Sequence, residues 1–391
     1  MPAVSRHVAD RADIAPFHVM EVVRAARERA DAGHDVLHLE VGQPSTGAPA
    51  TAIAAARAAL DRPEQLGYTD AHGLPELRAR IARHYLDRHG LEVDPGQVSV
   101  TQGASMACVL AFLAAFDVGD RVGVCEPGYP CYRQMLSALG CDVVPVPIGP
   151  ATRFQPTPAL LDEAGPLDGV VVASPSNPTG SQLTAAELAA IAGWCDANDV
   201  RLIADEIYHG ISAVGPAPTA LSHAAIRPVV VNSFSKYFSM TGWRLGWAVL
   251  PAELVRPVEL LAQNLVISAP TLSQIAAVAA FDGTDELDGH VRRYDTNRGI
   301  LRAGLEALGC TTIAPPDGAF YLYADVSHLT DDSAALCAVW LEELGIAATP
   351  GVDFDPVWGH RSIRFSFAGS TATMQLATER LSRWGRSVRR Q

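Results

Sequence analysis

Residues 169–208 read GVVVASPSNPTGSQLTAAELAAIAGWCDANDVRLIADEIY. An apolar, β-branched run at 169–173 is followed by a helical stretch at 185–196 and by a second apolar run at 201–204. A strand, a helix and a second strand in this order form the unit that builds parallel sheets. Because both runs are apolar almost throughout, their strands should be buried on both faces. The stretch therefore predicts an α/β fold, with a mostly parallel sheet covered by helices.

The same alternation continues on both sides of this stretch. Strands are predicted at 98–101, 121–125, 141–146 and 229–232, with helices starting near Ser105 and Tyr132. After Pro251 the pattern changes to long helices, through Leu261 and at 286–308, followed by strands at 320–326 and 362–367. We interpret residues 46–265 as a large domain and residues 266–391 as a small α+β domain. The N-terminal segment, residues 1–45, is expected to join the small domain. It should contain a helix near 19–32 and a strand at 36–39.

Composition restricts the class of protein. Of the 391 residues, 48% are hydrophobic and 19% are charged, as in globular proteins. The net charge of -13 argues against nucleic-acid binding, and no apolar run is long enough to span a bilayer. Residues 1–13 show no secretory signal, and the 7 cysteines include no C-x-x-C pair. We expect a cytoplasmic protein with small-molecule ligands and neither nucleic-acid nor membrane partners.

Chemically useful side chains follow the predicted strands at the point where each strand ends. Ser233-Phe-Ser-Lys236 follows one strand, and Asp205-Glu-Ile-Tyr208 ends another. In parallel sheets, ligands bind at the carboxyl ends of the strands. A lysine in partly buried surroundings is disfavoured in its charged form and is therefore a better amine nucleophile. Taken alone, however, each segment also fits an ordinary loop.

Two further turns belong to the same edge. Asn177-Pro-Thr-Gly180 closes the strand at 170–173, and Gly103-Ala-Ser105 joins a strand to a helix. A small-residue turn at a helix start can bind phosphate through backbone N–H groups and the helix dipole. Either turn alone is common, so only the combination and its order carry weight.

Together these segments resemble the fold-type I aminotransferases of the class I/II family. The resemblance extends from Val41-Gly-Gln-Pro44 to Arg364, and so covers nearly the whole chain. It implies the fold of that family, a large domain with a mostly parallel sheet plus a smaller α+β domain. It also implies pyridoxal 5'-phosphate (PLP) as cofactor and transfer of an amino group from an L-amino acid to a 2-oxo acid.

The resemblance also implies residue roles around the cofactor ring. Lys236 would hold the cofactor as a Schiff base and move a proton at the substrate's α-carbon. Asp205 would pair with the protonated ring nitrogen. Tyr208 and Asn177 would contact the ring's phenolic oxygen, and Tyr129, in Glu126-Pro-Gly-Tyr-Pro130, would stack on the ring.

Further roles concern the cofactor phosphate and the substrate. The family pattern assigns the phosphate to Ala104, Ser105, Ser233 and Arg244, together with Tyr68 of a neighbouring subunit. A homodimer with shared active sites follows from the last assignment. Arg364, with Gly42 and Asn177 beside it, would bind the substrate carboxylate through a planar, two-branched contact. Without the other motifs, Arg364 would be read as a surface charge on a strand.

Several alternatives remain open or are set aside. The same cofactor chemistry would also serve a lyase or cyclase, through β-elimination, C–S cleavage or a specialised biosynthetic step. A PLP-binding regulator would need a basic DNA-binding module, for which neither length nor charge leaves room. His34 and His38 lie in a predicted strand, where four-residue spacing does not converge on a metal, so no metal site is expected.

The sequence also bears on the substrate. Relatives that act on dicarboxylates use a second arginine from the segment corresponding to 263–274, and this stretch, QNLVISAPTLSQ, contains none. We therefore expect a neutral, aromatic or otherwise unusual amino donor rather than aspartate.

Overall fold

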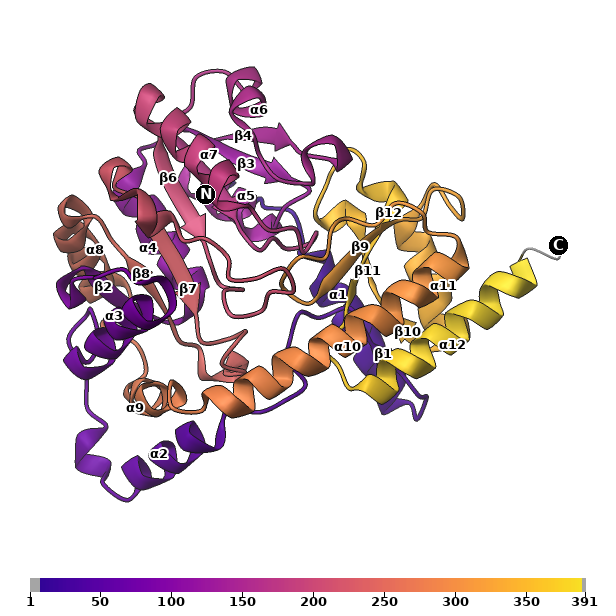
Figure 1. Ribbon diagram of the computed structural model, residues 1–391, viewed down its shortest axis with the longest axis horizontal. Helices are drawn as coiled ribbons and strands as arrows, with labels where there is room; N and C mark the ends of the chain where they lie inside the picture. Colours follow the sequence, from indigo (N-terminus) through magenta and orange to yellow (C-terminus); the bar gives the residue numbers. More distant parts are fainter. Residues whose placement is uncertain (1–7, 389–391) are drawn as a thin grey trace, which may run out of the picture.

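The computed structural model describes residues 8–388. Residues 1–7, which belong to the stretch expected to carry no secretory signal, lie outside the described part. Seven strands form the main sheet, in the order β2-β8-β7-β6-β5-β3-β4 (Figure 1). Their bounds are β2 Val98–Thr101, β3 Arg121–Glu126, β4 Asp142–Pro147, β5 Gly169–Ala173, β6 Arg201–Asp205, β7 Val229–Ser233 and β8 Gly246–Val249. Only β8 runs antiparallel to its neighbours, which confirms the mostly parallel sheet.

Helices cover both faces of this sheet. One face carries α4 (Gly103–Ala115), α5 (Pro130–Leu139) and α8 (Ala252–Leu265), and the other carries α3 (Pro75–His89), α6 (Pro158–Glu163) and α7 (Ala185–Asn198). Val170 and Val172 pack into one core while Val171 packs into the other, so successive residues of β5 point to opposite faces. The continuous apolar run of the sequence is thus explained by burial on both sides.

A smaller antiparallel sheet lies beside the first, in the order β11-β12-β9. It consists of β9 (Tyr321–Asp325), β11 (Thr349–Pro350) and β12 (Ser362–Ser366). A short parallel pair joins β1 (Leu37–His38) to β10 (Ile346–Ala347). Around these strands lie α1 (His18–Asp31), α10 (Thr284–Leu308), α11 (Ser333–Leu344) and α12 (Thr371–Val388). The N-terminal residues therefore pair with C-terminal ones, which brings the start of the chain to the small sheet.

Two helices lie at the lower left of Figure 1, α2 (Ala50–Leu60) and α9 (Thr271–Ala280), and they pack against each other. The sequence analysis did not predict α9. Its residues, TLSQIAAVAA, are mostly small and apolar, and they lack the alternation of polar and apolar faces that marks a surface helix. None of the residues of α9 is exposed and none carries a charge, so no polar face marks this helix in the sequence and periodicity did not detect it.

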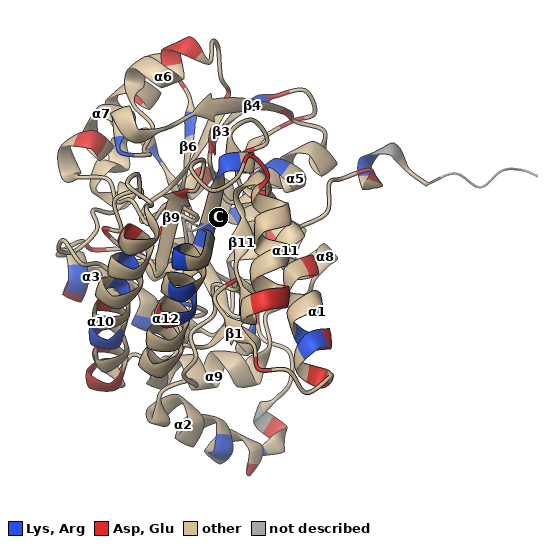
Figure 2. Ribbon diagram, turned by 90° about the vertical axis from the view of Figure 1, so that its right-hand side faces the viewer, with Lys and Arg blue, Asp and Glu red and all other residues tan. Residues whose placement is uncertain are grey.

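The outer helices carry mixed charge. Acidic and basic residues occur together along α10 and α12 (Figure 2). None of the helices in the described part of the chain combines the length and the apolar character needed to cross a bilayer.

Candidate active site

One cavity, of about 210 Å³, lies at the carboxyl ends of the parallel strands. Eleven of the residues singled out in the sequence line it: Gly42, Ala104, Ser105, Tyr129, Asn177, Asp205, Tyr208, Ser233, Lys236, Arg244 and Arg364. They lie at the ends of β6 and β7 or in segments next to β1, β2, β3, β5, β6, β7 and β8, except for Arg364, which lies within β12. Because parallel strands end at one edge, residues far apart in sequence meet there. Tyr68 is the exception: it does not line this cavity, and its side chain is 85% exposed.

Lys236 lies in the loop after β7 and points into the cavity. Its Nζ donates a hydrogen bond to the carbonyl oxygen of Gly42 at 2.7 Å. Burial and, to a smaller extent, the positive charge of Arg364 lower the pKa of Lys236 to about 8, while Asp205 opposes the shift. A substantial fraction of this amine is therefore neutral near physiological pH, as a nucleophile requires.

Asp205 ends β6 and is buried at 4% exposure. Burial raises the pKa of its carboxyl to about 6, against hydrogen bonds that favour the charged form. The backbone N–H of Ile207 donates at 3.0 Å, and the Tyr132 hydroxyl donates to the other oxygen. A buried carboxylate held in this way is a partner for a cation that enters the cavity.

The sequence analysis did not identify Tyr132 as a site residue. It lies three residues after Tyr129 at the start of α5, and the two rings meet edge to face at 5.2 Å. Spacing of three on a helix start places both rings on one side, so the Tyr-x-x-Tyr pattern was the available signal.

Arg364, in the middle of β12, is only 2% exposed, so the alternative of a surface charge is wrong. Its guanidinium donates to Asn177 Oδ1 at 2.8 Å, to Thr349 Oγ1 at 3.3 Å and to the carbonyl oxygen of Glu40. These acceptors are neutral, and within residues 8–388 no carboxylate forms an ion pair with Arg364. A buried guanidinium with an uncompensated charge fits an anionic ligand.

Tyr208 and Tyr321 form the wall of the cavity next to Arg364. Their hydroxyl oxygens are 2.8 Å apart, and the Arg364 guanidinium lies 4.5 Å from the centre of the Tyr321 ring. Burial raises the pKa of Tyr208 well above its usual value, which keeps the phenol protonated. Gly42 is required here, because a Cβ at this position would lie 1.6 Å from the Tyr321 hydroxyl. Tyr321 carried no recognisable motif in the sequence.

The end of the cavity opposite Arg364 has groups that favour the binding of an anion. Helix α4 begins at Gly103 without a side-chain cap, so its first N–H groups remain available. Gly103 has φ of 79°, a left-handed conformation that favours glycine, and a Cβ there would lie 2.7 Å from Arg244 Nη2. The Arg244 guanidinium donates to the Thr241 carbonyl at 3.0 Å, and no described carboxylate pairs with it. Helix start and guanidinium together fit a phosphate group.

A third wall of the cavity is apolar. Phe17, Val19, Met20 and Val41 supply it from the start of α1 and the segment after β1. Asp353 holds this helix start by accepting the backbone N–H groups of His18 at 3.0 Å and Val19 at 3.1 Å. The sequence analysis predicted the helix but not its place at the cavity, because the anchoring carboxylate is 334 residues away.

Within the described residues, no group of three or more His, Cys, Asp and Glu side chains is arranged to hold a metal ion. His34 is in the turn after α1 and His38 in β1, where its Nδ1 contacts Glu40 at 2.8 Å.

Comparisons with known proteins agree with this geometry. The family described as aminotransferase class I and II matches residues 34–381. The valine–pyruvate aminotransferase of Mycobacterium tuberculosis is 53% identical over 381 residues, covering 96% of this chain and 98% of the relative. The aspartate/prephenate aminotransferase of Thermus thermophilus is 33% identical, covering 94% and 96%.

Solved structures give the same result. The crystal structure of an aminotransferase from Mycobacterium tuberculosis superimposes with a TM-score of 0.95 at 52% identity, covering 98% of this chain and 100% of that one. The aspartate aminotransferase of Thermus thermophilus with maleate gives a TM-score of 0.91 at 32% identity, covering 97% and 99%. The chain belongs to the class I and II aminotransferases, enzymes of fold type I, and it transfers an amino group between an amino acid and a 2-oxo acid.

Proposed function

We propose that the chain performs this transfer with pyridoxal 5'-phosphate, and that Lys236 is the amine that carries it. The supporting observation is that a lysine with a lowered pKa and a buried carboxylate, Asp205, line one cavity whose far end fits a phosphate. When bound, the cofactor supplies an aldehyde that condenses with amines and a protonated ring that withdraws electrons from the substrate's α-carbon.

Each polar residue then has a distinct task. Asp205 keeps a negative charge beside the ring nitrogen, and Lys236, once free, carries the proton to and from the α-carbon. Tyr208 donates to the ring's phenolic oxygen. Asn177 has its Oδ1 engaged by Arg364, so its amide nitrogen is the group left to donate there. Tyr129 stacks on the ring face.

The two ends of the cavity bind anions. Ala104 and Ser105, at the start of α4, hold the phosphate together with Ser233 and Arg244. At the other end, Arg364 binds the substrate carboxylate, and the backbone of Gly42 lies beside it. The uncompensated charge of Arg364 makes this assignment favourable, since the carboxylate replaces no existing ion pair.

We propose a neutral, apolar amino acid as donor, with valine as the model, and pyruvate as acceptor. The cations that line the cavity are Lys236, Arg244 and Arg364, and each already has a task. The remaining wall, with Phe17 and Met20, is apolar and would leave a second substrate carboxylate unpaired. The relative named for valine and pyruvate is also more similar to this chain than the Thermus thermophilus relative named for aspartate and prephenate.

This preference is tested with purified enzyme and a panel of amino donors. Valine with pyruvate should give kcat/KM at least about 100-fold higher than aspartate with pyruvate, because burying an unpaired carboxylate costs several kcal/mol. Formation of the 2-oxo acid should require the added acceptor, with no ammonia released in its absence. A clear preference for aspartate would contradict the proposed apolar donor.

We further propose a homodimer with shared sites, in which Tyr68 reaches the phosphate end of the other subunit's cavity. Tyr68 is 85% exposed and does not line its own cavity, and Leu265 and Ile267, which lie between α8 and α9 or at the end of α8, are also exposed. Light scattering should give twice the 41.4 kDa chain mass. Tyr68→Ala should weaken cofactor binding about tenfold, as expected for losing a hydrogen bond to a charged group.

Mixed dimers give a sharper test. A dimer of one Lys236→Ala subunit and one Tyr68→Ala subunit has both defects in one site and none in the other, if sites are shared. At a cofactor concentration near the wild-type dissociation constant, where Tyr68→Ala sites stay mostly empty, its activity should exceed that of either homodimer and reach about half of wild type per dimer. A monomer of 41.4 kDa, or no gain on mixing, would contradict shared sites.

Two smaller proposals accompany this function. The seven cysteines, all unpaired, favour a reducing compartment such as the cytoplasm. The division into 1–45, 46–265 and 266–391 is supported by two observations. Strand β1 pairs with β10, and the strands of the main sheet all precede α8 in the sequence while those of the small sheet all follow it.

A further inference from the structure

Two consecutive residues after β4 adopt a left-handed backbone. Arg153 has φ of 54° and Phe154 has φ of 56°, and neither is glycine. Each such residue costs about 1 kcal/mol, and this cost persists only where the surroundings hold the conformation. The contacts that hold these two residues in this conformation connect them to segments of the active site.

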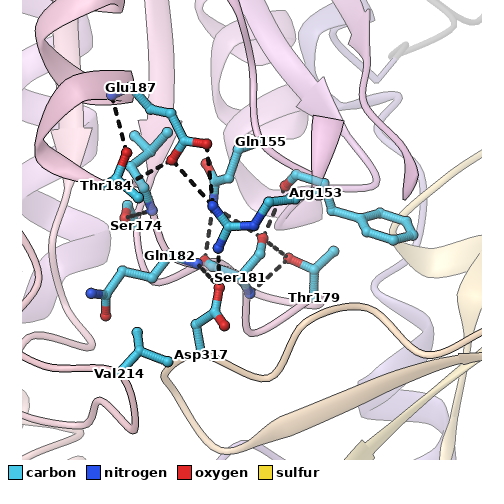
Figure 3. Close-up of polar contacts among 12 residues, drawn as sticks. Arg153, Gln155, Ser174, Thr179, Ser181, Gln182, Thr184, Glu187, Val214 and Asp317 are labelled. Atoms are coloured by element: carbon cyan, nitrogen blue, oxygen red, sulfur yellow. Dashed lines mark hydrogen bonds and ion pairs between the residues drawn. The ribbon is translucent and has the colours of Figure 1, made fainter. Parts of the chain in front are cut away.

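The Arg153 side chain joins two parts of the molecule that are distant in sequence. Its Nη1 donates to Glu187 of α7 at 3.2 Å, and its Nη2 donates to Asp317 at 2.7 Å (Figure 3). Glu187 is itself fixed, because its carboxylate accepts the backbone N–H of Thr184 at the start of α7. We call Arg153, Glu187 and Asp317 the Arg153 network. Asp317 precedes β9 and its side chain is only 13% exposed.

The backbone of the strained turn holds the loop that carries Asn177. The carbonyl oxygen of Phe154 accepts the Ser181 hydroxyl at 3.0 Å, and Gln155 Nε2 donates to the Ser181 carbonyl at 2.8 Å. The Ser181 carbonyl also accepts the backbone N–H of Ser176, which precedes Asn177. Ser181 is completely buried, so these bonds have no competition from water.

Asp317 belongs to a segment held between two active-site loops. The backbone N–H of Gly318 donates to Gly180 at 2.8 Å, and that of Ala213 donates to the Asp317 carbonyl at 2.7 Å. Asp317 Oδ2 also accepts the backbone N–H of Gln182 at 3.3 Å. A Cβ on Gly180 would lie 3.0 Å from the Tyr321 carbonyl, so the loop and the segment are in close contact.

This segment leads directly to Tyr321, whose ring lies under Arg364. The Asn177 loop, on the other side, supplies the acceptor for Arg364. Both supports of the Arg364 guanidinium thus lie within a few residues of contacts made by the Arg153 network.

We infer that Arg153 and Asp317 are positioning residues for the carboxylate-binding site, acting through the Asn177 loop and the Tyr321 segment. The pair fixes the distance between these two segments, and thereby the orientation of Arg364 between them. This inference rests on the proposed role of Arg364. It predicts that weakening the Arg153–Asp317 pair impairs the binding of both substrates, because both carry the same α-carboxylate, while the cofactor's phosphate end is untouched.

Asp317→Asn tests the inference, since it removes the charge and keeps an oxygen for the Gln182 N–H. KM for the amino donor and for the oxo acid should each rise about tenfold, in the range of coupling carried by such networks. The kcat should change by less than about threefold, and cofactor affinity should stay at the wild-type value. Arg153→Gln, which removes the positive charge of the same ion pair, should reproduce this pattern. Arg153→Lys, which keeps the charge, should show a smaller rise in both KM values.

The matched control is Glu306→Gln, which breaks the Arg302–Glu306 ion pair on the outer face of α10 at 2.8 Å and should leave both KM values unchanged. Melting temperatures of all variants separate lost stability from lost positioning. A lower melting temperature with unchanged KM in both Asp317→Asn and Arg153→Gln would overturn the inference, leaving a structural role only.

A double variant identifies the route. Adding Asp317→Asn to Asn177→Ala should raise KM by clearly less than the tenfold expected in the wild-type background, because one of the two supports is already lost. Full additivity would overturn the route through Asn177. In the same assay, Arg364→Ala reports on the proposed function: if that variant keeps the wild-type KM, the carboxylate site itself has been misassigned, whatever Asp317→Asn shows.

Discussion

The Lys236→Ala variant is expected to lose at least about 10⁴-fold in kcat, because one substitution removes both the reacting amine and the proton carrier at the α-carbon. The amine of Lys236 has no substitute in the cavity, whose other cations are the guanidiniums of Arg244 and Arg364. Single-turnover kinetics with valine would measure the loss. Borohydride reduction of the wild-type holoenzyme, followed by peptide mapping, should place the pyridoxyl label on Lys236.

Arg364→Ala is the matched control, since it removes a different side chain of the same cavity, the one proposed to bind the substrate carboxylate. It should keep the yellow colour of the holoenzyme while KM for the amino donor rises about 100-fold, as expected when a buried charge partner is truncated. Equal loss of cofactor in both variants, or a pyridoxyl label on another residue, would contradict the separate tasks assigned to Lys236 and Arg364.

The Asp205→Asn variant is expected to lose about 10²- to 10³-fold in kcat, with a much smaller change in KM. The amide keeps the shape of the carboxylate but carries no charge to stabilise a protonated ring nitrogen. Steady-state kinetics at saturating cofactor would measure the loss. Retention of more than a tenth of the wild-type kcat would show that the charge of Asp205 is not required.

Tyr132→Phe is the control for this second prediction. Burial raises the pKa of the Asp205 carboxyl, and the hydrogen bond from the Tyr132 hydroxyl opposes this rise, which leaves the pKa at about 6. Without this hydrogen bond the pKa rises further, so Asp205 becomes protonated at higher pH. The acidic limb of the kcat/KM profile should therefore move to higher pH, with activity at pH 8 largely kept.

The main sheet could be predicted from the sequence because its determinants are local. The run at 169–173 coincides with β5, and the run at 201–204 differs from β6 by one residue. Parallel strands end at one edge, so motifs placed after them had to meet. The likeness to a known family then supplied roles that no local pattern contains.

The remaining features depend on contacts between distant parts of the chain. Tyr321 meets Tyr208 across 113 residues, and Asp317 meets Arg153 across 164. Neither pair has a spacing rule that a single sequence would reveal. Helix α9 was missed for a different reason, since a helix without exposed or charged residues has no polar face to give it a period.

The attachment of α1 through Asp353 has an evolutionary consequence. The side chains of Phe17 and Met20 line the cavity, but the helix is held by backbone N–H groups, which every residue except proline provides. Substitutions at these two positions can therefore accumulate without loosening the helix or disturbing Lys236. Descendants of one ancestral enzyme could diverge in the amino acids they accept while inheriting the same chemistry.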